Sequence, residues 1–199
     1  MKKYSTKLLY LKSGLISGQM FAALMVASLA MADTTLRRTT LLVSDLEASI
    51  RFYSALGMTP FYDASRNQRT DGSIIGENDL PLAGEPRKSR IYILTGADPD
   101  SGMIGLLSYS DPALESGVIG LDGVGEGEVI LMFSVDDIQQ TRQSFAALGV
   151  TMHREPYRYE VRNNDGKLQA SGWRMFAYDP DDRLIEIAQR DDMDLPGDQ

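Results

Sequence analysis

The chain has 199 residues, with 20 Lys plus Arg, 28 Asp plus Glu, one His and no Cys, so its formal net charge is −8. The absence of Cys excludes disulfides, cysteine-based zinc sites, iron–sulfur clusters and a cysteine nucleophile. Because His153 is the only histidine, one chain cannot build a site that needs two or three histidines. An acidic chain without a basic patch is a poor partner for phosphate backbones, so we expect no nucleic-acid partner.

Residues 1–32, which carry four Lys and no acidic residue, are predicted to be a secretory signal peptide. Their mostly apolar stretch at 15–30 is followed by the pattern Ala30-Met31-Ala32, which is typical of a cleavage site. Cleavage after Ala32 would remove four positive charges and change the net charge from −8 to −12. We therefore expect a periplasmic or secreted protein with no stable membrane insertion after processing. The alternatives are an uncleaved anchor and a cytoplasmic protein that starts at Met31.

Matching segments in the same order along the chain indicate that the remaining sequence is an internal repeat. The matches, in chain order, are VSDLE (43–47) with VDDIQ (135–139), ALGMT (55–59) with ALGVT (147–151), and DPDSGMIG (98–105) with DPDDRLIE (179–186). The last match has a shorter offset, because the first half carries extra residues before it. The sequence thus predicts one domain followed by an acidic tail. Its parts are the domain at 33–190, a first module at about 36–110, a connector at 111–127, a second module at about 128–190, and the tail at 191–199.

Each module is predicted to consist of a strand, a helix and then further strands. Apolar or β-branched runs predict the strands, which are 39–43, 58–62, 90–95 and 103–109 in the first module and 129–135, 150–154, 157–161, 173–178 and 183–189 in the second. A helix-start signal follows the first strand of each module, and a glycine suited to a left-handed C-cap ends each helix. These residues are Ser44, Glu47 and Gly57 in the first module and Asp136, Gln139 and Gly149 in the second. Both modules approximate βαβββ, so we expect an α+β fold.

Residues 63–89 are predicted to form a long polar loop, rich in Gly, Pro, Asn and Arg. This segment contains the extra residues of the first module. A loop of this length inside a compact domain is usually a lid, a binding loop or a disordered insertion, and the sequence leaves these alternatives open.

Two fused βαβββ modules that carry V-x-D-[LI], A-L-G and D-P-D ahead of a strand resemble the vicinal oxygen chelate superfamily. This superfamily includes glyoxalase I, extradiol dioxygenases, fosfomycin-resistance enzymes and bleomycin-binding proteins. The resemblance covers Leu36–Gln189 and implies paired modules whose sheets curve around a cleft. Because members pair their modules within or between chains, a homodimer is compatible with it. The motifs are specific for the fold and not for one activity, so the function has to be argued from the site.

The resemblance implies four metal-ligand positions, on the first and last strands of each module. The repeat places them at Arg38, Gly105, Ile130 and Glu186. Of these, only Glu186 can bind a divalent cation, whereas Arg38 is always a cation and would repel one. A catalytic metal needs about three protein ligands, so we expect no metal and no other cofactor. A divalent metal held by other ligands is the alternative.

Arg38 and Glu186 are expected to converge in the cleft, because the resemblance brings their positions together. One hypothesis is a structural ion pair across the cavity. A second is that Arg38 binds an anionic group of a ligand while Glu186 orients it or accepts a proton as a catalytic base. A third is that one of the two side chains points to solvent. Further candidate ligand-binding residues, on strands that flank the same concavity, are Thr40, Tyr109, Met132, Trp173 and Phe176. We expect His153 to be a surface or structural residue, and Asp98 and Asp179 to form turns.

The resulting function prediction is an exported protein that binds a small organic molecule in its cleft without a metal, as the resemblance to bleomycin-binding proteins implies. The first alternative is a glyoxalase- or dioxygenase-like enzyme, a lyase or an isomerase, with Glu186 as base in an atypical or metal-independent site. The second alternative is a protein with only a structural or interaction role. One result would distinguish each function. Turnover that Glu186→Gln abolishes indicates the enzyme, and ligand binding that survives a chelator indicates the binding protein. A partner protein recovered with the chain indicates the interaction role.

Overall fold

The structure, a computed structural model, describes residues 35–97, 102–115, 124–125 and 127–191. These residues belong to one compact unit that begins at Thr35. Its elements are β1 (Arg38–Leu42), α1 (Leu46–Ala55), β2 (Thr59–Asn67), α2 (Gln68–Asp71), β3 (Lys88–Thr95), β4 (Met103–Ser110), β5 (Leu131–Ser134), α3 (Ile138–Leu148), β6 (Met152–Arg162), β7 (Leu168–Tyr178) and β8 (Leu184–Arg190). The predicted signal peptide, part of the connector and nearly all of the acidic tail lie outside the described residues. Among the described residues, no helix combines the length and apolar character that crossing a membrane requires.

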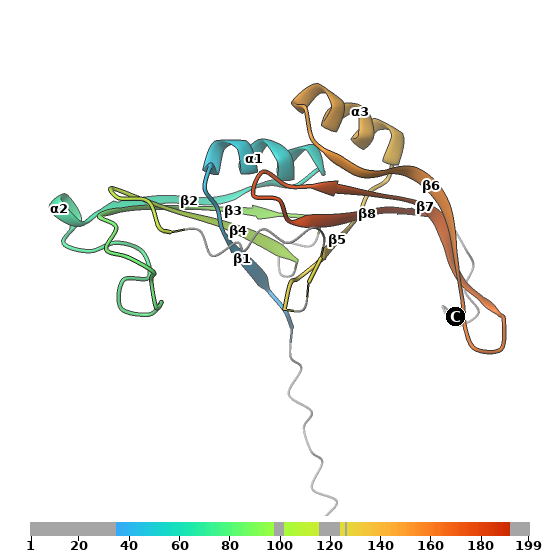
Figure 1. Cartoon of the computed structure of the whole chain (residues 1–199), viewed down its shortest axis with the longest axis horizontal. Helices are drawn as coiled ribbons and strands as arrows, with labels where there is room; N and C mark the ends of the chain where they lie inside the picture. The colour runs from blue at the N-terminus through green and yellow to red at the C-terminus, as the bar shows by residue number, and fades with distance from the viewer. Residues whose placement is uncertain (1–34, 98–101, 116–123, 126, 192–199) are drawn as a thin grey trace, which may run out of the picture. The chain divides into compact units, whose positions relative to one another are not determined.

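The strands form two four-stranded sheets, with the order β1-β4-β3-β2 in one and β5-β8-β7-β6 in the other. In each sheet the first strand pairs in parallel with the last strand of its module, and the other pairs are antiparallel. The register repeats as well, since Thr40 lies opposite Gly105 and Met132 lies opposite Glu186. Figure 1 shows α1 and α3 side by side on one face of the sheets. The predicted α+β fold of two βαβββ modules is confirmed, and within the described residues no strand of one sheet pairs with the other.

Both long helices begin one residue later than the sequence pattern predicts. The N-cap of α1 is Asp45, whose Oδ1 accepts a hydrogen bond of 2.9 Å from the Ala48 N–H. The N-cap of α3 is Asp137, whose Oδ1 accepts from two backbone N–H groups of the first turn. A carboxylate at this position satisfies free N–H groups and also faces the positive end of the helix dipole. Gly149 ends α3 in the left-handed conformation, as predicted, with a φ of 70°.

β6 is one strand where the sequence pattern predicts two. Its pairing with β7 shifts register three times, and Pro156 lies within the second irregularity, between Arg154 and Tyr157. A proline cannot donate to a sheet ladder, but it is tolerated on an edge strand or at a bulge, and both conditions hold here. Pro156 therefore bends the strand without ending it. The turn predicted at 163–166 closes the β6–β7 hairpin.

Aromatic side chains of the two long helices join the modules in one core. Phe52 of α1 and Phe145 of α3 stack with ring centroids 4.9 Å apart, and they are 2% and 0% exposed. Tyr53 of α1 contacts Phe133 of β5, with ring centroids 5.9 Å apart. The buried side chains of β4, β7 and β8 that face the helices belong to the same cluster. The helix-covered faces of both modules therefore share one core.

A buried carboxylate also connects the modules. Asp179 follows β7, and its side chain is 0% exposed. Its Oδ2 accepts a 2.9 Å hydrogen bond from the Tyr53 hydroxyl, and its Oδ1 accepts from the backbone N–H groups of Asp181 and Arg183. The Arg183 guanidinium contacts Oδ2 at 3.1 Å and also donates to the Leu42 carbonyl of the other module. Asp179 therefore does more than form the predicted turn, because donors from both modules satisfy its charge and lone pairs.

The pKa of Tyr53 is raised well above its ordinary value, because the ring is buried and the Asp179 carboxylate disfavours a phenolate beside it. A group with a raised pKa contributes stability below its unfolded pKa, about 10 for tyrosine, and loses this contribution as the pH rises further. We expect Tyr53→Phe to be about 1 kcal/mol less stable than the wild type near neutral pH, and the difference to shrink above about pH 10. Urea denaturation at a series of pH values measures this difference. Parallel curves would contradict the expectation, and Tyr62→Phe, at an exposed tyrosine, is the control.

The extra residues of the first module cover the helix-free face of its sheet. This buried cluster contains Ile74, Ile91, Ile93, Met103, Leu107 and Tyr109, with Ile75 and Leu82 packed against it. The face lies opposite the shared core, because Ile93 alternates along β3 with Leu94, which belongs to that core. The Tyr109 hydroxyl donates to the Ile75 carbonyl at 2.8 Å, and the Ile75 N–H donates to Ser89 Oγ at 2.9 Å. We call this surface, covered by residues 72–87, the module-one face.

The segment predicted as a long polar loop is thus a packed cover whose ends are strands. β2 continues to Asn67 and β3 begins at Lys88. Where the segment leaves and returns, the Gln68 N–H donates to the Arg87 carbonyl at 2.9 Å. The packing is not evident from the polar composition of the segment, because only a few of its apolar residues contact the module-one face.

Candidate functional site

The helix-free face of the second sheet brings candidate residues together. Alternate residues of β7 and β8 point into the shared core, so the residues between them, such as Phe176 and Glu186, lie on the opposite face. We call it the module-two face, and Met132 on it is 49% exposed. Three rows of side chains cross it: Met132, Glu186, Phe176 and Arg154 in the first, Ala188, Arg174 and Tyr157 in the second, and Arg190, Gly172 and Tyr159 in the third.

An ion pair lies at the centre of the module-two face. Arg174 Nε is 2.9 Å from Glu186 Oε1, and the two side chains are 25% and 19% exposed. The Nε–H is not aligned with this oxygen, so the buried Nε has no hydrogen-bond partner. The Arg174 guanidinium also lies over the Tyr159 ring, with its central carbon 4.1 Å from the ring centroid. Charge and stacking therefore hold the pair, and its hydrogen-bonding groups are only partly used.

The predicted ion pair between Arg38 and Glu186 is not the one that forms. Glu186 pairs with Arg174, and within the described part of the chain Arg38 has no carboxylate partner. The expectation is wrong because Arg174 lies on the adjoining strand of the same sheet, whereas Arg38 belongs to the other sheet. Arg38 instead lies beside β4, since a Cβ at Gly105 would be 3.1 Å from its Cδ and 3.1 Å from Thr40 Oγ1. The absence of a side chain at Gly105 leaves room for both residues.

The four positions at which the resemblance implies a metal do not fit one. Gly105 has no side chain, Ile130 offers no ligating atom and is 45% exposed, and Arg38 brings a positive charge. Glu186 has a ligating group, but it already contacts the Arg174 cation. Among the described residues, no group of three or more His, Cys, Asp or Glu side chains is placed to hold a metal ion. The side chains that are present suit direct contacts with a ligand better than metal coordination.

The aromatic candidates occupy three different environments. Phe176 lies on the module-two face, directly opposite Glu186. Trp173 lies on the other face of the sheet and packs against the shared core, so the structure does not bring it to the predicted cleft. Tyr109 is 8% exposed beneath residues 72–87, and burial raises its pKa. Of the three, Phe176 alone is therefore placed to contact a ligand beside Glu186.

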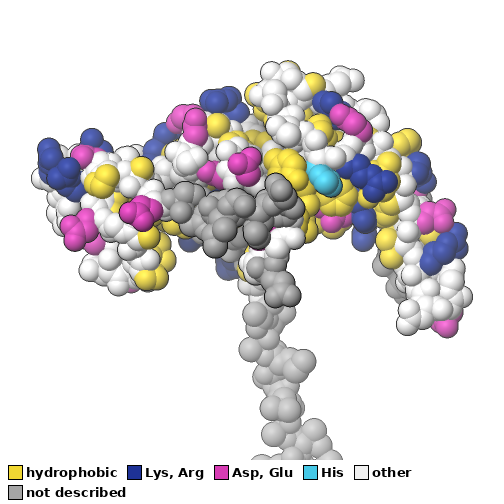
Figure 2. All heavy atoms as spheres, in the orientation of Figure 1, with side chains coloured by type: hydrophobic (Ala, Val, Ile, Leu, Met, Phe, Trp, Pro, Cys, Tyr) yellow, Lys and Arg dark blue, Asp and Glu magenta, His cyan; other side chains and the backbone are white. Residues whose placement is uncertain are grey.

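His153 lies at the border of the module-two face. Its imidazole makes edge contacts with the rings of Phe176 and Tyr178, whose centroids are 6.4 and 5.9 Å away, and Nδ1 is 3.5 Å from the Tyr178 hydroxyl. Figure 2 shows the histidine among hydrophobic side chains, with Lys or Arg side chains close by. These contacts are mainly with rings, which agrees with the structural role expected for it.

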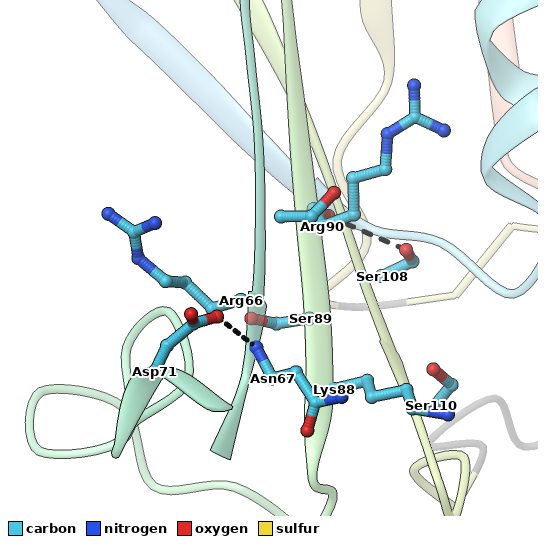
Figure 3. Close-up of a pocket in the computed structure, with 9 residues that line it drawn as sticks. Arg66, Asn67, Asp71, Lys88, Ser89, Arg90, Ser108 and Ser110 are labelled. Atoms are coloured by element: carbon cyan, nitrogen blue, oxygen red, sulfur yellow. Dashed lines mark hydrogen bonds between the residues drawn. The ribbon is translucent and has the colours of Figure 1, made fainter. Parts of the chain in front are cut away.

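A hollow of about 290 Å³ lies on the first sheet and is a weaker candidate (Figure 3). Its lining is polar and consists of Ser65, Arg66, Asn67, Asp71, Lys88, Ser89, Arg90, Ser108 and Ser110. Arg90 is already neutralised, because its guanidinium contacts Asp63 at 2.8 Å and Glu47 at 2.7 Å. Lys88 likewise lies 3.6 Å from Asp111. The positive charges of Arg90 and Lys88 are therefore used within the protein, whereas Arg66 has no carboxylate partner among the described residues.

Sequence reasoning missed Arg174 and the two tyrosines of β6. Strand alternation was the available signal, because Arg174 is two residues before Phe176, and Tyr157 and Tyr159 share one face of their strand. The bulges of β6 nevertheless decide which residue of β7 each tyrosine meets, and alternation alone does not locate a bulge.

Solved structures similar to this chain include a glyoxalase family protein from Bacillus cereus, with a TM-score of 0.57 and 18% identity over 81% of this chain and 99% of that chain. Glyoxalase I of Leishmania major has a TM-score of 0.45 and 20% identity, over 78% of this chain and 86% of that chain. The fosfomycin resistance protein FosX of Mesorhizobium loti has a TM-score of 0.43 and 17% identity, over 77% and 89% of the two chains. At 18% identity, the likeness to the Bacillus cereus protein shows the fold alone. No curated protein matches the chain.

The family model for the Glyoxalase/Bleomycin resistance protein/Dioxygenase superfamily matches residues 35–187. This match covers both modules and more than half of the chain, and it agrees with the paired βαβββ topology. The chain therefore belongs to the Glyoxalase/Bleomycin resistance protein/Dioxygenase superfamily.

Proposed function

We propose that the chain is an exported member of this superfamily that binds a small organic molecule on its module-two face without a metal. The composition of residues 1–32 supports export. The ion pair of Arg174 and Glu186 carries the binding proposal, because it is only partly exposed and its Glu186 lies between the apolar residues Met132 and Phe176. A few polar groups with unused hydrogen-bonding capacity, set among apolar side chains, are the usual composition of a small-molecule site.

The two modules differ in how much apolar surface they leave available. Residues 72–87 of the chain itself cover most of the module-one face, where Leu42 is the one large aliphatic side chain of β1 to β4 that stays exposed, at 46%. On or beside the module-two face, Ile130, Met132 and Val161 are 45%, 49% and 42% exposed. A ligand that covers these side chains would remove apolar surface from water, which favours binding.

The proposal predicts saturable binding of an uncharged aromatic probe, N-phenyl-1-naphthylamine, to the processed protein in the presence of EDTA. We expect Phe176→Ala to weaken this binding roughly tenfold, because the substitution removes an aromatic wall of the site. Phe61→Ala is the matched control, since Phe61 is 57% exposed on the first sheet, and it should leave the affinity unchanged. Fluorescence titration measures the affinity of each protein.

Probe binding that does not saturate, or that both substitutions weaken equally, would contradict the proposed binding site on the module-two face.

Metal binding is tested on the same sample by incubation with Mn, Fe(II), Ni or Zn, desalting and elemental mass spectrometry. We expect retention far below about one equivalent, since a metal site needs about three protein ligands. Retention near one equivalent that Glu186→Ala abolishes would show that a metal binds with Glu186 as a ligand, and the proposal would then be wrong.

A further inference from the structure

The module-two face differs in charge from the chain as a whole. The formal net charge of the chain is −8. The three rows of the face nevertheless contain Arg154, Arg174 and Arg190, and Glu186 is the one acidic residue in them. A local excess of guanidinium groups on an acidic protein is suited to an anion.

Two other arginines of the chain form bidentate ion pairs, in which the guanidinium donates hydrogen bonds to both oxygens of a carboxylate. Arg142 donates to both oxygens of Glu155, at 2.6 and 2.7 Å. Arg158 donates to both oxygens of Asp191, at 2.8 and 2.7 Å. Such bidentate pairs use the planar fork of N–H donors that a guanidinium presents.

Arg154 and Arg174 are held differently, because their guanidinium groups stack on tyrosine rings. The central carbon of Arg154 is 3.5 Å from the centroid of the Tyr157 ring, and that of Arg174 is 4.1 Å from the centroid of the Tyr159 ring. Within the described residues, neither guanidinium donates a hydrogen bond to a carboxylate or a carbonyl. Stacking fixes the plane of a guanidinium while its N–H edge stays free for an acceptor.

From this arrangement we infer that the module-two face takes an aromatic molecule that carries an oxyanion, such as a carboxylate, a sulfonate or a phosphate. The Arg174 guanidinium holds the oxyanion, and the aromatic body lies against Phe176. This inference rests on the proposed function and narrows the class of its ligand.

Of the two stacked arginines, Arg174 is better placed to bind the oxyanion of the ligand. Glu186 approaches its Nε side and Tyr159 covers one face of the guanidinium, so the terminal Nη groups are left for a ligand. Two oxygens of an oxyanion match these donors in a bidentate geometry. Arg174 is also two residues from Phe176 on the same face of β7, which places the charged and the aromatic contacts next to each other.

The test compares two probes that share one aromatic body. 1-Anilinonaphthalene-8-sulfonate carries a sulfonate, and N-phenyl-1-naphthylamine is its uncharged parent. We expect the processed protein to bind the sulfonate about tenfold more tightly than the parent. Arg174→Met should abolish this preference and leave the affinity for the parent nearly unchanged. Arg174→Lys, which keeps the charge without the planar fork, should reduce the preference.

Arg162→Met is the matched control for these substitutions. Arg162 lies at the end of β6, is 53% exposed and pairs with Glu160, so its loss should leave both affinities unchanged. Equal affinities of the wild type for the two probes would overturn the oxyanion inference while the proposed function stands. Saturable binding of neither probe would overturn the proposed function itself.

Two further outcomes bear on the role of Arg174. A sulfonate preference that survives Arg174→Met would overturn the assignment of the oxyanion to this residue. If thermal unfolding shows that Arg174→Met does not fold, Arg174→Lys decides the question, and an undiminished preference in that protein would overturn the assignment.

Discussion

Replacement of Asp179 with alanine is expected to lower the free energy of unfolding by about 3–5 kcal/mol, as for other buried charge pairs that lose one partner. The substitution leaves the buried Tyr53 hydroxyl without an acceptor and removes the nearer of the two carboxylates that contact the Arg183 guanidinium, so that only Asp181, at 3.3 Å, is left. The backbone N–H groups of Asp181 and Arg183 lose an acceptor at the same time. Each buried donor left unsatisfied costs about 1–3 kcal/mol, so the effects accumulate. Urea denaturation monitored by circular dichroism measures the change.

Asp165→Ala is the control for this substitution. Asp165 lies in the turn between β6 and β7, is exposed, and should change the free energy of unfolding by no more than about 0.5 kcal/mol. Tyr53→Phe removes one of the donors to Asp179 and should give an intermediate loss. If Asp179→Ala is no more destabilising than Asp165→Ala, the carboxylate does not join the modules in the way the geometry indicates.

Gly172→Ala is expected to destabilise the protein by about 3 kcal/mol, because an added methyl group has no space. A Cβ at this position would lie 2.1 Å from the Gln189 carbonyl oxygen and 3.0 Å from the Arg190 Cα. Both are backbone atoms of β8, so two paired strands would have to separate. Because Tyr159 lies opposite Gly172, the same displacement should also weaken binding of the aromatic probes. Thermal unfolding and fluorescence titration measure the two effects.

Gly96→Ala is the control for Gly172→Ala, because it replaces a glycine by alanine at a position where the added methyl group meets no steric clash. Apart from its chain neighbours, no heavy atom of the described residues lies within 4 Å of a Cβ built on Gly96, and its backbone is not in the left-handed region. We therefore expect no loss of stability, since alanine restricts the unfolded chain more than glycine does. Equal losses for the two substitutions would contradict the packing argument at Gly172.

The fold could be predicted largely from the repeat, because strand-to-helix junctions carry local signals. Capping signals act within a few residues of the chain, so the helix starts are predicted to within one residue and Gly149 is predicted correctly, although the N-caps are Asp45 and Asp137 rather than Ser44 and Asp136. The cover at 72–87 could not be predicted, since its contacts with β3 and β4 depend on distant residues and its composition is polar. The bulges of β6 are hidden for a similar reason, because they appear only in the pairing with β7.

The candidate site was predicted in part. The sequence predicts that Met132, Phe176 and Glu186 line the same concavity, and in the structure the register places Met132 and Phe176 opposite Glu186. The partner of Glu186 could not be predicted, because the choice between Arg38 and Arg174 depends on how the two sheets are arranged. The buried role of Asp179 was hidden for a related reason, since an aspartate before a proline has a sufficient local explanation as a turn.

The irregular outer strand β6 has a consequence for self-association. An open strand edge can template the addition of strands from other molecules, which leads to aggregation. β6 carries Arg154, Glu155, Arg158 and Glu160 together with Pro156 and repeated shifts of register, all of which oppose strand addition. The apolar side chains of the neighbouring face can therefore stay accessible in solution without a flat edge at β6 from which fibrils could grow.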